Sequence, residues 1–145
     1  ASARSNRPLR TALRIALATS SGQMNGTRIA SPRTSAIDAG VANAIILPVV
    51  MEYNAEYTGE KYREIARAMG VEGVDEMTQA EYRKAAVDAV RKLSQDVGIP
   101  ADLKAIVKEE DVQFLAESAY ADACRPGNPR DTSVEEIAAL FRSMM

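Results

Sequence analysis

The 145-residue sequence has no histidine, no tryptophan and a single cysteine, Cys124. One cysteine cannot form an internal disulfide, which fits a reducing compartment such as the cytoplasm. Imidazole is the usual protein ligand of iron and zinc, so a site for either metal would have to use carboxylates and Cys124 alone. We therefore expect neither a transition metal nor a metal-dependent reaction on this chain by itself.

Aromatic residues are also few, with five tyrosines and two phenylalanines. The core must then consist of Ala, Val, Ile, Leu and Met, a composition that favours helices over sheets. The longest apolar run, Ala44 to Met51, is too short to span a bilayer, so no membrane partner is expected. No glycine-rich phosphate loop lies between a strand and a helix, so no nucleotide cofactor is expected to bind this chain.

Charge divides the sequence into two unequal parts. Residues 1–40 hold six arginines and one acidic residue, Asp38, whereas residues 41–145 hold 12 basic and 19 acidic residues. Residues 1–40 are rich in Arg and Ser and contain one short stretch, residues 11–18, that could form two helical turns. Their composition predicts a poorly structured basic arm. Such an arm resembles an organelle transit peptide or could contact phosphates, although the lack of lysine and aromatic residues makes nucleic acid an unfavoured partner.

From residue 41 onward, apolar residues recur at helical spacing. The pattern predicts helices over 41–54, 60–69, 78–97, 110–124 and 133–144, the first with Pro48 inside it as a kink or a break. Capping boxes begin the third helix at Thr78 and the last at Ser133, while Gly70 ends the second helix and Gly98 ends the third. The sequence thus predicts an all-α domain, a bundle of about five helices over residues 41–145, with Leu93, Val97 and Tyr120 on inner faces.

Two acidic clusters could suggest a metal or acid–base site, Glu109-Glu110-Asp111 and Glu135-Glu136. Each cluster opens a predicted helix, where negative charge stabilises the helix dipole. We interpret them as first-turn acids. Arg130, just before the last capping box, is interpreted as a structural residue that ties its turn to a nearby carboxylate.

Four motifs follow one another in order, and together they resemble a known family. They are Gly40 to Pro48 (GVANAIILP) continuing to Asn54 (MEYN), Thr58 to Ala66 (TGEKYREIA), Asp96 to Pro100 (DVGIP), and Gly127 to Arg130 (GNPR). Residues 40–145 are in this respect similar to the C-terminal helical domain of the iron-containing (group III) alcohol dehydrogenases. The likeness is strongest to the branch of lactaldehyde reductases and propanediol dehydrogenases.

The resemblance implies a second, dinucleotide-binding domain, an NAD cofactor, and an iron or zinc ion held by one aspartate and three histidines. The last of these histidines lies immediately before the glycine matched by Gly40, and here that residue is Ala39. No catalytic, cofactor-binding or metal-binding residue is therefore carried over. Cys124 could line a pocket by resemblance; the alternative is a half-buried cysteine at a helix end, beside Tyr120 and Ala123.

Two hypotheses follow. In the first, the chain is a C-terminal domain fragment of an NAD-dependent enzyme that interconverts a small alcohol or diol with its aldehyde or ketone. It would be inactive alone, cytoplasmic, and prone to self-association through an exposed apolar face, for example on the helix bearing Ala44 to Met51. The arm would then be unrelated sequence joined to a truncated enzyme, or an organelle-targeting segment. In the second hypothesis, the chain is a stand-alone helical interaction module with a basic arm.

Overall fold

The structure is a computed structural model that describes the backbone of residues 35–145 and the side chains of residues 40–145. The predictions for residues 1–34, including the two helical turns at 11–18, lie outside the described residues. The described part holds five α-helices and no strand, which confirms the all-α fold. The helices are α2 (Ser35–Asn54), α3 (Lys61–Ala68), α4 (Gln79–Asp96), α5 (Glu109–Tyr120) and α6 (Val134–Ser143), with short 3₁₀ turns at Ala55–Tyr57, Val74–Glu76 and Arg125–Gly127.

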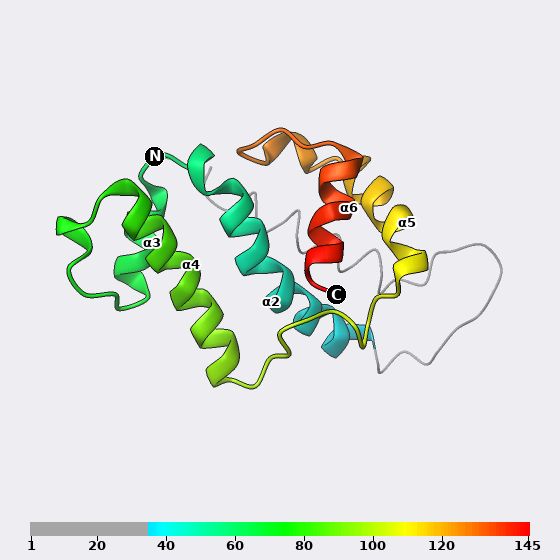
Figure 1. Ribbon diagram of the computed structural model, residues 1–145, viewed down its shortest axis with the longest axis horizontal. Coiled ribbons are helices and arrows are strands. Elements are labelled where there is room, and N and C mark those ends of the chain that lie inside the picture. The colour runs from blue at the N-terminus through cyan, green and yellow to red at the C-terminus, as the bar shows by residue number, and fades with distance from the viewer. Residues whose placement is uncertain (1–34) are drawn as a thin grey trace.

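Helix α2 lies in the middle, with α3 and α4 on one side and α5 and α6 on the other (Figure 1). Its residues Ala42, Ile45 and Ile46 pack into one apolar cluster with α5 and α6, and Met51 packs into another with α3 and α4. The first cluster contains Ala42, Ile45, Ile46, Leu103, Val107, Val112, Leu115, Ala116, Ala119, Ile137, Ala138, Phe141 and Met144. The second contains Met51, Tyr62, Ala66, Val74, Tyr82, Ala86 and Val87. The two halves of the domain therefore share α2 as their common element.

Helix α2 corrects one prediction and decides between two alternatives. It begins at Ser35 rather than at Val41, and it continues past Pro48 as one helix, which excludes the break that was one of the two expectations for this proline. Proline removes one backbone donor and costs about 3 kcal/mol in a helix interior. Pro48 is itself buried, and apolar residues before and after it pack into the two clusters. Burial of the helix on both sides therefore outweighs the local preference of proline.

The predicted helix ends are correct where capping signals mark them. Thr78 and Ser133 both form complete capping boxes, and Gly70 and Gly98 follow α3 and α4 with positive φ angles of 78° and 77°. Helix α5 ends at Tyr120 rather than at Cys124. The Cys124 amide donates to the Asp122 carboxylate at 2.6 Å, and this local hydrogen bond favours a turn over a further helical turn.

Three residues expected on inner faces lie instead at the surface. Leu93, Val97 and Tyr120 are 50%, 65% and 39% exposed. Leu93 lies in the last turn of α4 and Val97 caps its C-terminal end, beyond the part that packs into the second apolar cluster, whose α4 members end at Val90. Helical spacing identifies the apolar face but does not reveal where along the helix its neighbour ends.

Candidate functional site

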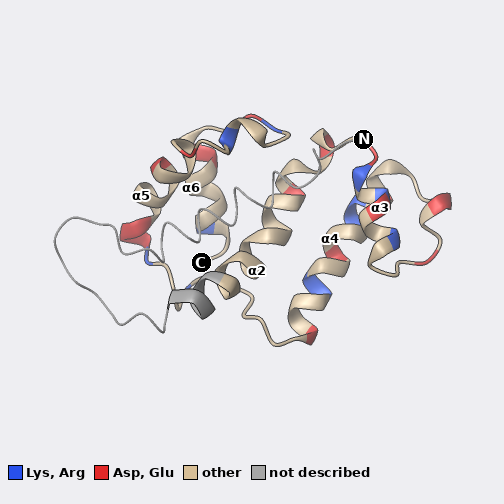
Figure 2. Cartoon of the chain, turned by 180° about the vertical axis from the view of Figure 1, so that it is seen from behind, with Lys and Arg blue, Asp and Glu red and all other residues tan. Residues whose placement is uncertain are grey.

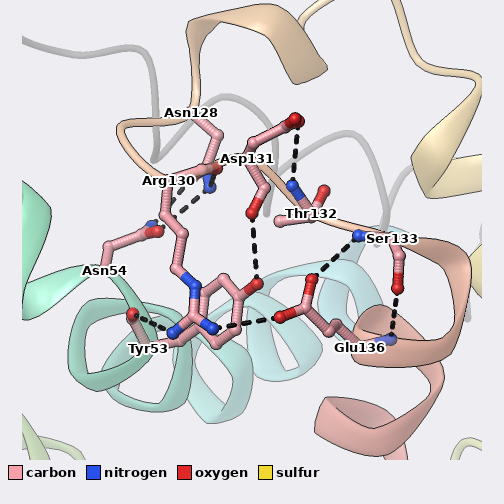
Figure 3. A network of polar contacts seen from close by, with 8 residues as sticks. All are labelled: Tyr53, Asn54, Asn128, Arg130, Asp131, Thr132, Ser133 and Glu136. Atoms are coloured by element: carbon pink, nitrogen blue, oxygen red, sulfur yellow. Dashed lines mark hydrogen bonds and ion pairs between the residues drawn. The ribbon is translucent and has the colours of Figure 1, made fainter.

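The best-defined polar arrangement in the described chain joins the end of α2 to the turn before α6 (Figure 3). Asn54, only 1% exposed, exchanges two hydrogen bonds with Asn128: each amide nitrogen donates to the other's oxygen, at 2.8 and 3.0 Å. The Asn128 amide nitrogen also lies 2.6 Å from the backbone oxygen of Arg130. These contacts connect residues 74 positions apart in the sequence.

Arg130 is the second element of this network. Its guanidinium lies 3.9 Å from the ring centre of Tyr53, donates to the Tyr53 carbonyl at 3.4 Å, and forms an ion pair with Glu136 at 3.0 Å. The ion pair agrees with the structural role that the sequence predicts for Arg130. A stacked, paired guanidinium holds the turn against α2.

Two titratable groups of this network, Tyr53 and Glu136, are held in their ordinary charge states at neutral pH. Burial, and then the Glu136 carboxylate, raises the pKa of Tyr53 to about 12. The Ser133 backbone amide, 3.0 Å from Glu136, lowers the pKa of that carboxyl group. A neutral phenol, a carboxylate and an arginine that pair with one another provide rigidity, and none is prepared to act as a general base at neutral pH.

An apolar cavity of about 60 Å³ lies beside the network, between α2, α5 and α6. Its walls include Ile46, Val50, Phe141 and Met144, and its polar lining residues are Tyr53, Arg125, Asn128 and Thr132. Cys124 is half-buried and lies just before the 3₁₀ turn at Arg125–Gly127. It is not among the described residues that line this cavity. Its proposed place in the pocket of a complete enzyme stays a prediction.

The acidic clusters lie in the first turns of α5 and α6, as the sequence predicts. Over residues 40–145, no three or more Cys, Asp or Glu side chains gather in a way that could hold a metal ion. Figure 2 shows basic and acidic residues together on α3, α4 and α6, whereas the charged residues of α5 are all acidic. Ala39 lies in α2, but its side chain is outside the described part, so its correspondence to a metal-binding histidine stays a prediction.

Comparison with known sequences and structures decides the family. The profile of the Fe-containing alcohol dehydrogenase family, C-terminal part, matches residues 34–145. The chain belongs to this family. Lactaldehyde reductase of Escherichia coli K12 is 53% identical over 105 residues, which cover 72% of this chain and 27% of that protein. 1,3-Propanediol dehydrogenase of Klebsiella pneumoniae is 41% identical over 104 residues, covering 71% and 27%.

Solved structures of the family share the fold. A crystal structure of 1,3-propanediol oxidoreductase superimposes with a TM-score of 0.74 at 33% identity, covering 92% of this chain and 32% of that one. An alcohol dehydrogenase from Oenococcus oeni gives 0.73 at 30% identity, with the same coverage. The predicted resemblance is thus confirmed, and the chain spans about a quarter of the length of the curated relatives it matches.

The family description implies iron, and the residues of this chain do not fit such a site. The sequence has no histidine, and the described side chains include no cluster of carboxylates and cysteine that could replace one. Among residues 35–145, no helix is both long and apolar enough to cross a membrane.

Sequence reasoning missed the Asn54–Asn128 pair, since a hydrogen bond between such distant residues leaves no local pattern.

Proposed function

We propose that the chain is a C-terminal helical domain of an NAD-dependent, Fe-containing alcohol dehydrogenase and has no dehydrogenase activity by itself. The complete enzyme would interconvert a small alcohol or diol with its aldehyde or ketone. The observation that carries the proposal is the 53% identity to lactaldehyde reductase over 105 residues, together with the absence of histidine. The family histidine before Gly40 is Ala39 in this chain, so a metal ligand would be missing even beside a complete cofactor-binding region.

In this proposal the helical domain supplies shape rather than reacting groups. The Asn54–Asn128 pair and the stacking of Arg130 on Tyr53 hold the turn at residues 122–133 against α2, and the Arg130–Glu136 ion pair ties the same turn to α6. Such rigid support is what a cleft between two domains needs if its walls are to keep their positions. Neither NAD nor iron is expected to bind this chain alone, and we expect the chain in the cytoplasm.

The comparisons lend no support to the alternative of a stand-alone interaction module. The relatives and structures described above are enzymes of the alcohol dehydrogenase family, and each contains the matched segment as part of a longer chain. We therefore keep the dehydrogenase domain as the proposed function.

A matched pair of chimeric enzymes tests the proposal. In E. coli lactaldehyde reductase, the C-terminal segment is replaced by residues 40–145 of this chain. One chimera keeps the enzyme's own residue before Gly40, and the other carries alanine there. We expect the first to bind iron and to oxidise NADH with lactaldehyde, and the second to lose at least about 100-fold in activity or metal affinity.

Two results would contradict the proposal. A folded first chimera without activity would show that residues 40–145 cannot serve as the enzyme's helical domain. Equal activity and equal iron content in both chimeras would show that alanine before Gly40 removes no ligand. Circular dichroism on both chimeras separates these results from a failure to fold.

A further inference from the structure

The two halves of the domain are attached to α2 in different ways. On the side of α3 and α4, the buried Tyr62 hydroxyl donates to the Met51 carbonyl at 2.8 Å. An ion pair joins Arg91 of α4 to Glu52 of α2. Helix α4 also packs directly against α2. Because buried, polar and charged contacts all join them, α2 belongs to the same unit as α3 and α4.

The attachment of α2 to α5 and α6 contains a gap. Toward the start of α2, Ile45 and Ile46 are buried in the first apolar cluster. At its end, Tyr53 and Asn54 bind the turn before α6 through the polar network of Figure 3. Between these contacts lies the apolar cavity of about 60 Å³, with Ile46, Val50 and Tyr53 in its walls. Atoms that line a void lose dispersion contacts, so this part of the interface contributes less attraction than a filled one.

Helices α5 and α6 form a second unit together with the end of the loop before them. The two helices pack against each other as a hairpin (Figure 1). The Leu103 amide donates to the Met144 carbonyl at 2.8 Å, which ties the loop to the end of α6. The preceding segment, residues 97–102, has no buried residue and joins this unit to α4. Few buried contacts would therefore be lost if residues 103–145 moved as one body about this segment.

We propose that residues 103–145 open from α2 as one unit, with the Asn54–Asn128 pair as the latch, while α2, α3 and α4 stay folded together. Opening breaks the polar network and exposes the walls of the cavity. The part that stays folded, residues 35–97, is about as long as the smallest domains that fold alone. The opening depends on the contacts above and not on the proposed function. In a complete enzyme it would move the turn before α6 and α6 itself as one wall.

Native-state hydrogen exchange of the full chain, followed by NMR in low concentrations of urea, tests the proposal. The slowest amides of each helix report the opening that exposes that helix. We expect the slowest amides of α5 and α6 to exchange at least about 10-fold faster than those of α4. They should also share one urea dependence, weaker than that of α4, because partial opening exposes less surface than global unfolding.

Two variants act on different steps of the opening. Val87 is buried in the second apolar cluster, which is folded both before and after the opening. Val87→Ala should therefore speed exchange in α4 by about 10-fold and leave α5 and α6 within about 2-fold. The contacts of Asn54 with Asn128 exist only before the opening, so Asn54→Ala should speed exchange in both units by about 30-fold or more. The exposed control Gln95→Ala should change neither by more than about 2-fold.

Three results would overturn the proposal. Equal exchange rates and urea dependences in α4 and in α5 and α6 would show that the domain opens as a single unit. Equal acceleration of all three helices by Val87→Ala would show the same. Unchanged exchange of α5 and α6 in Asn54→Ala would show that the pair is no latch. The comparison within the unaltered chain needs no variant, so the proposal can be refuted even if a variant does not fold.

Discussion

Replacing Asn54 with alanine should destabilise the domain by about 2–3 kcal/mol. The substitution removes two amide hydrogen bonds to Asn128, at 2.8 and 3.0 Å, and each contributes about 1 kcal/mol net. It also leaves the part-buried Asn128 amide with unmet hydrogen-bonding capacity, which costs up to about another 1 kcal/mol. Domains of this size are stable by about 5–15 kcal/mol, so the expected loss is a large share.

Urea denaturation followed by circular dichroism at 222 nm measures this loss. The matched control is Gln95→Ala, because Gln95 is exposed on α4 and its substitution should change the free energy of unfolding by less than about 0.5 kcal/mol. Asn128→Ala and the double variant complete a cycle, in which the two residues should couple by about 1–2 kcal/mol. A loss below about 0.5 kcal/mol for Asn54→Ala would refute the importance of the pair.

Three further predictions concern burial, pH and the surface. Tyr62→Phe should cost about 1 kcal/mol by urea denaturation, because the buried hydroxyl donates to the Met51 carbonyl at 2.8 Å; an unchanged midpoint would contradict this. The hydroxyl and amide of Thr78 lower the pKa of Glu81, and the Ser133 amide lowers that of Glu136, below the ordinary 4.5. Their folded-state pKa values are depressed, so their stabilisation is present above the unfolded-state pKa and is lost as the pH falls through the folded-state values. The urea midpoint should therefore fall from about pH 5 to about pH 3, and a rise would contradict the prediction. Finally, we propose that the chain self-associates through Leu93 and Val97, 50% and 65% exposed, so light scattering should show a lower mass for Leu93→Lys/Val97→Lys than for the parent, and equal masses would contradict it.

This surface replaces the one expected from the sequence. The helix bearing Ala44 to Met51 was the example given for an exposed apolar face, but all eight residues are buried or half-buried in the structure. The error has a physical reason: an apolar run identifies a helix that must be covered, and it does not say whether the cover comes from the same domain. In this case both halves of the domain cover it.

Local signals in the sequence predicted most of the helices. The capping boxes at Thr78 and Ser133 and the glycines at 70 and 98 act through neighbouring backbone atoms, so they can be identified without the fold. The sequence left open whether Pro48 kinks the helix or breaks it, because the local cost of proline is outweighed by packing that only the fold reveals. The end of α5 was placed too late because the hydrogen bond from the Cys124 amide to the Asp122 carboxylate was not recognised.

The candidate site was less predictable than the fold. Arg130 could be assigned a structural role from its place before a capping box, and its ion pair with Glu136 agrees. Its stacking on Tyr53 and the pairing of Asn54 with Asn128 join segments more than 70 residues apart, and no local pattern marks such contacts. The side-chain oxygen of Asn43 is buried and has no hydrogen-bond partner among the described residues, and the sequence alone does not show such burial.

The most direct test of the central claim is NADH oxidation by the purified chain with lactaldehyde, run with added iron(II) or zinc and followed by a metal count on the protein. We predict no turnover and no retained metal, because the chain has no histidine and its described carboxylates form no metal-binding cluster. Turnover with about one metal ion per chain would contradict the claim and would require a metal site without histidine.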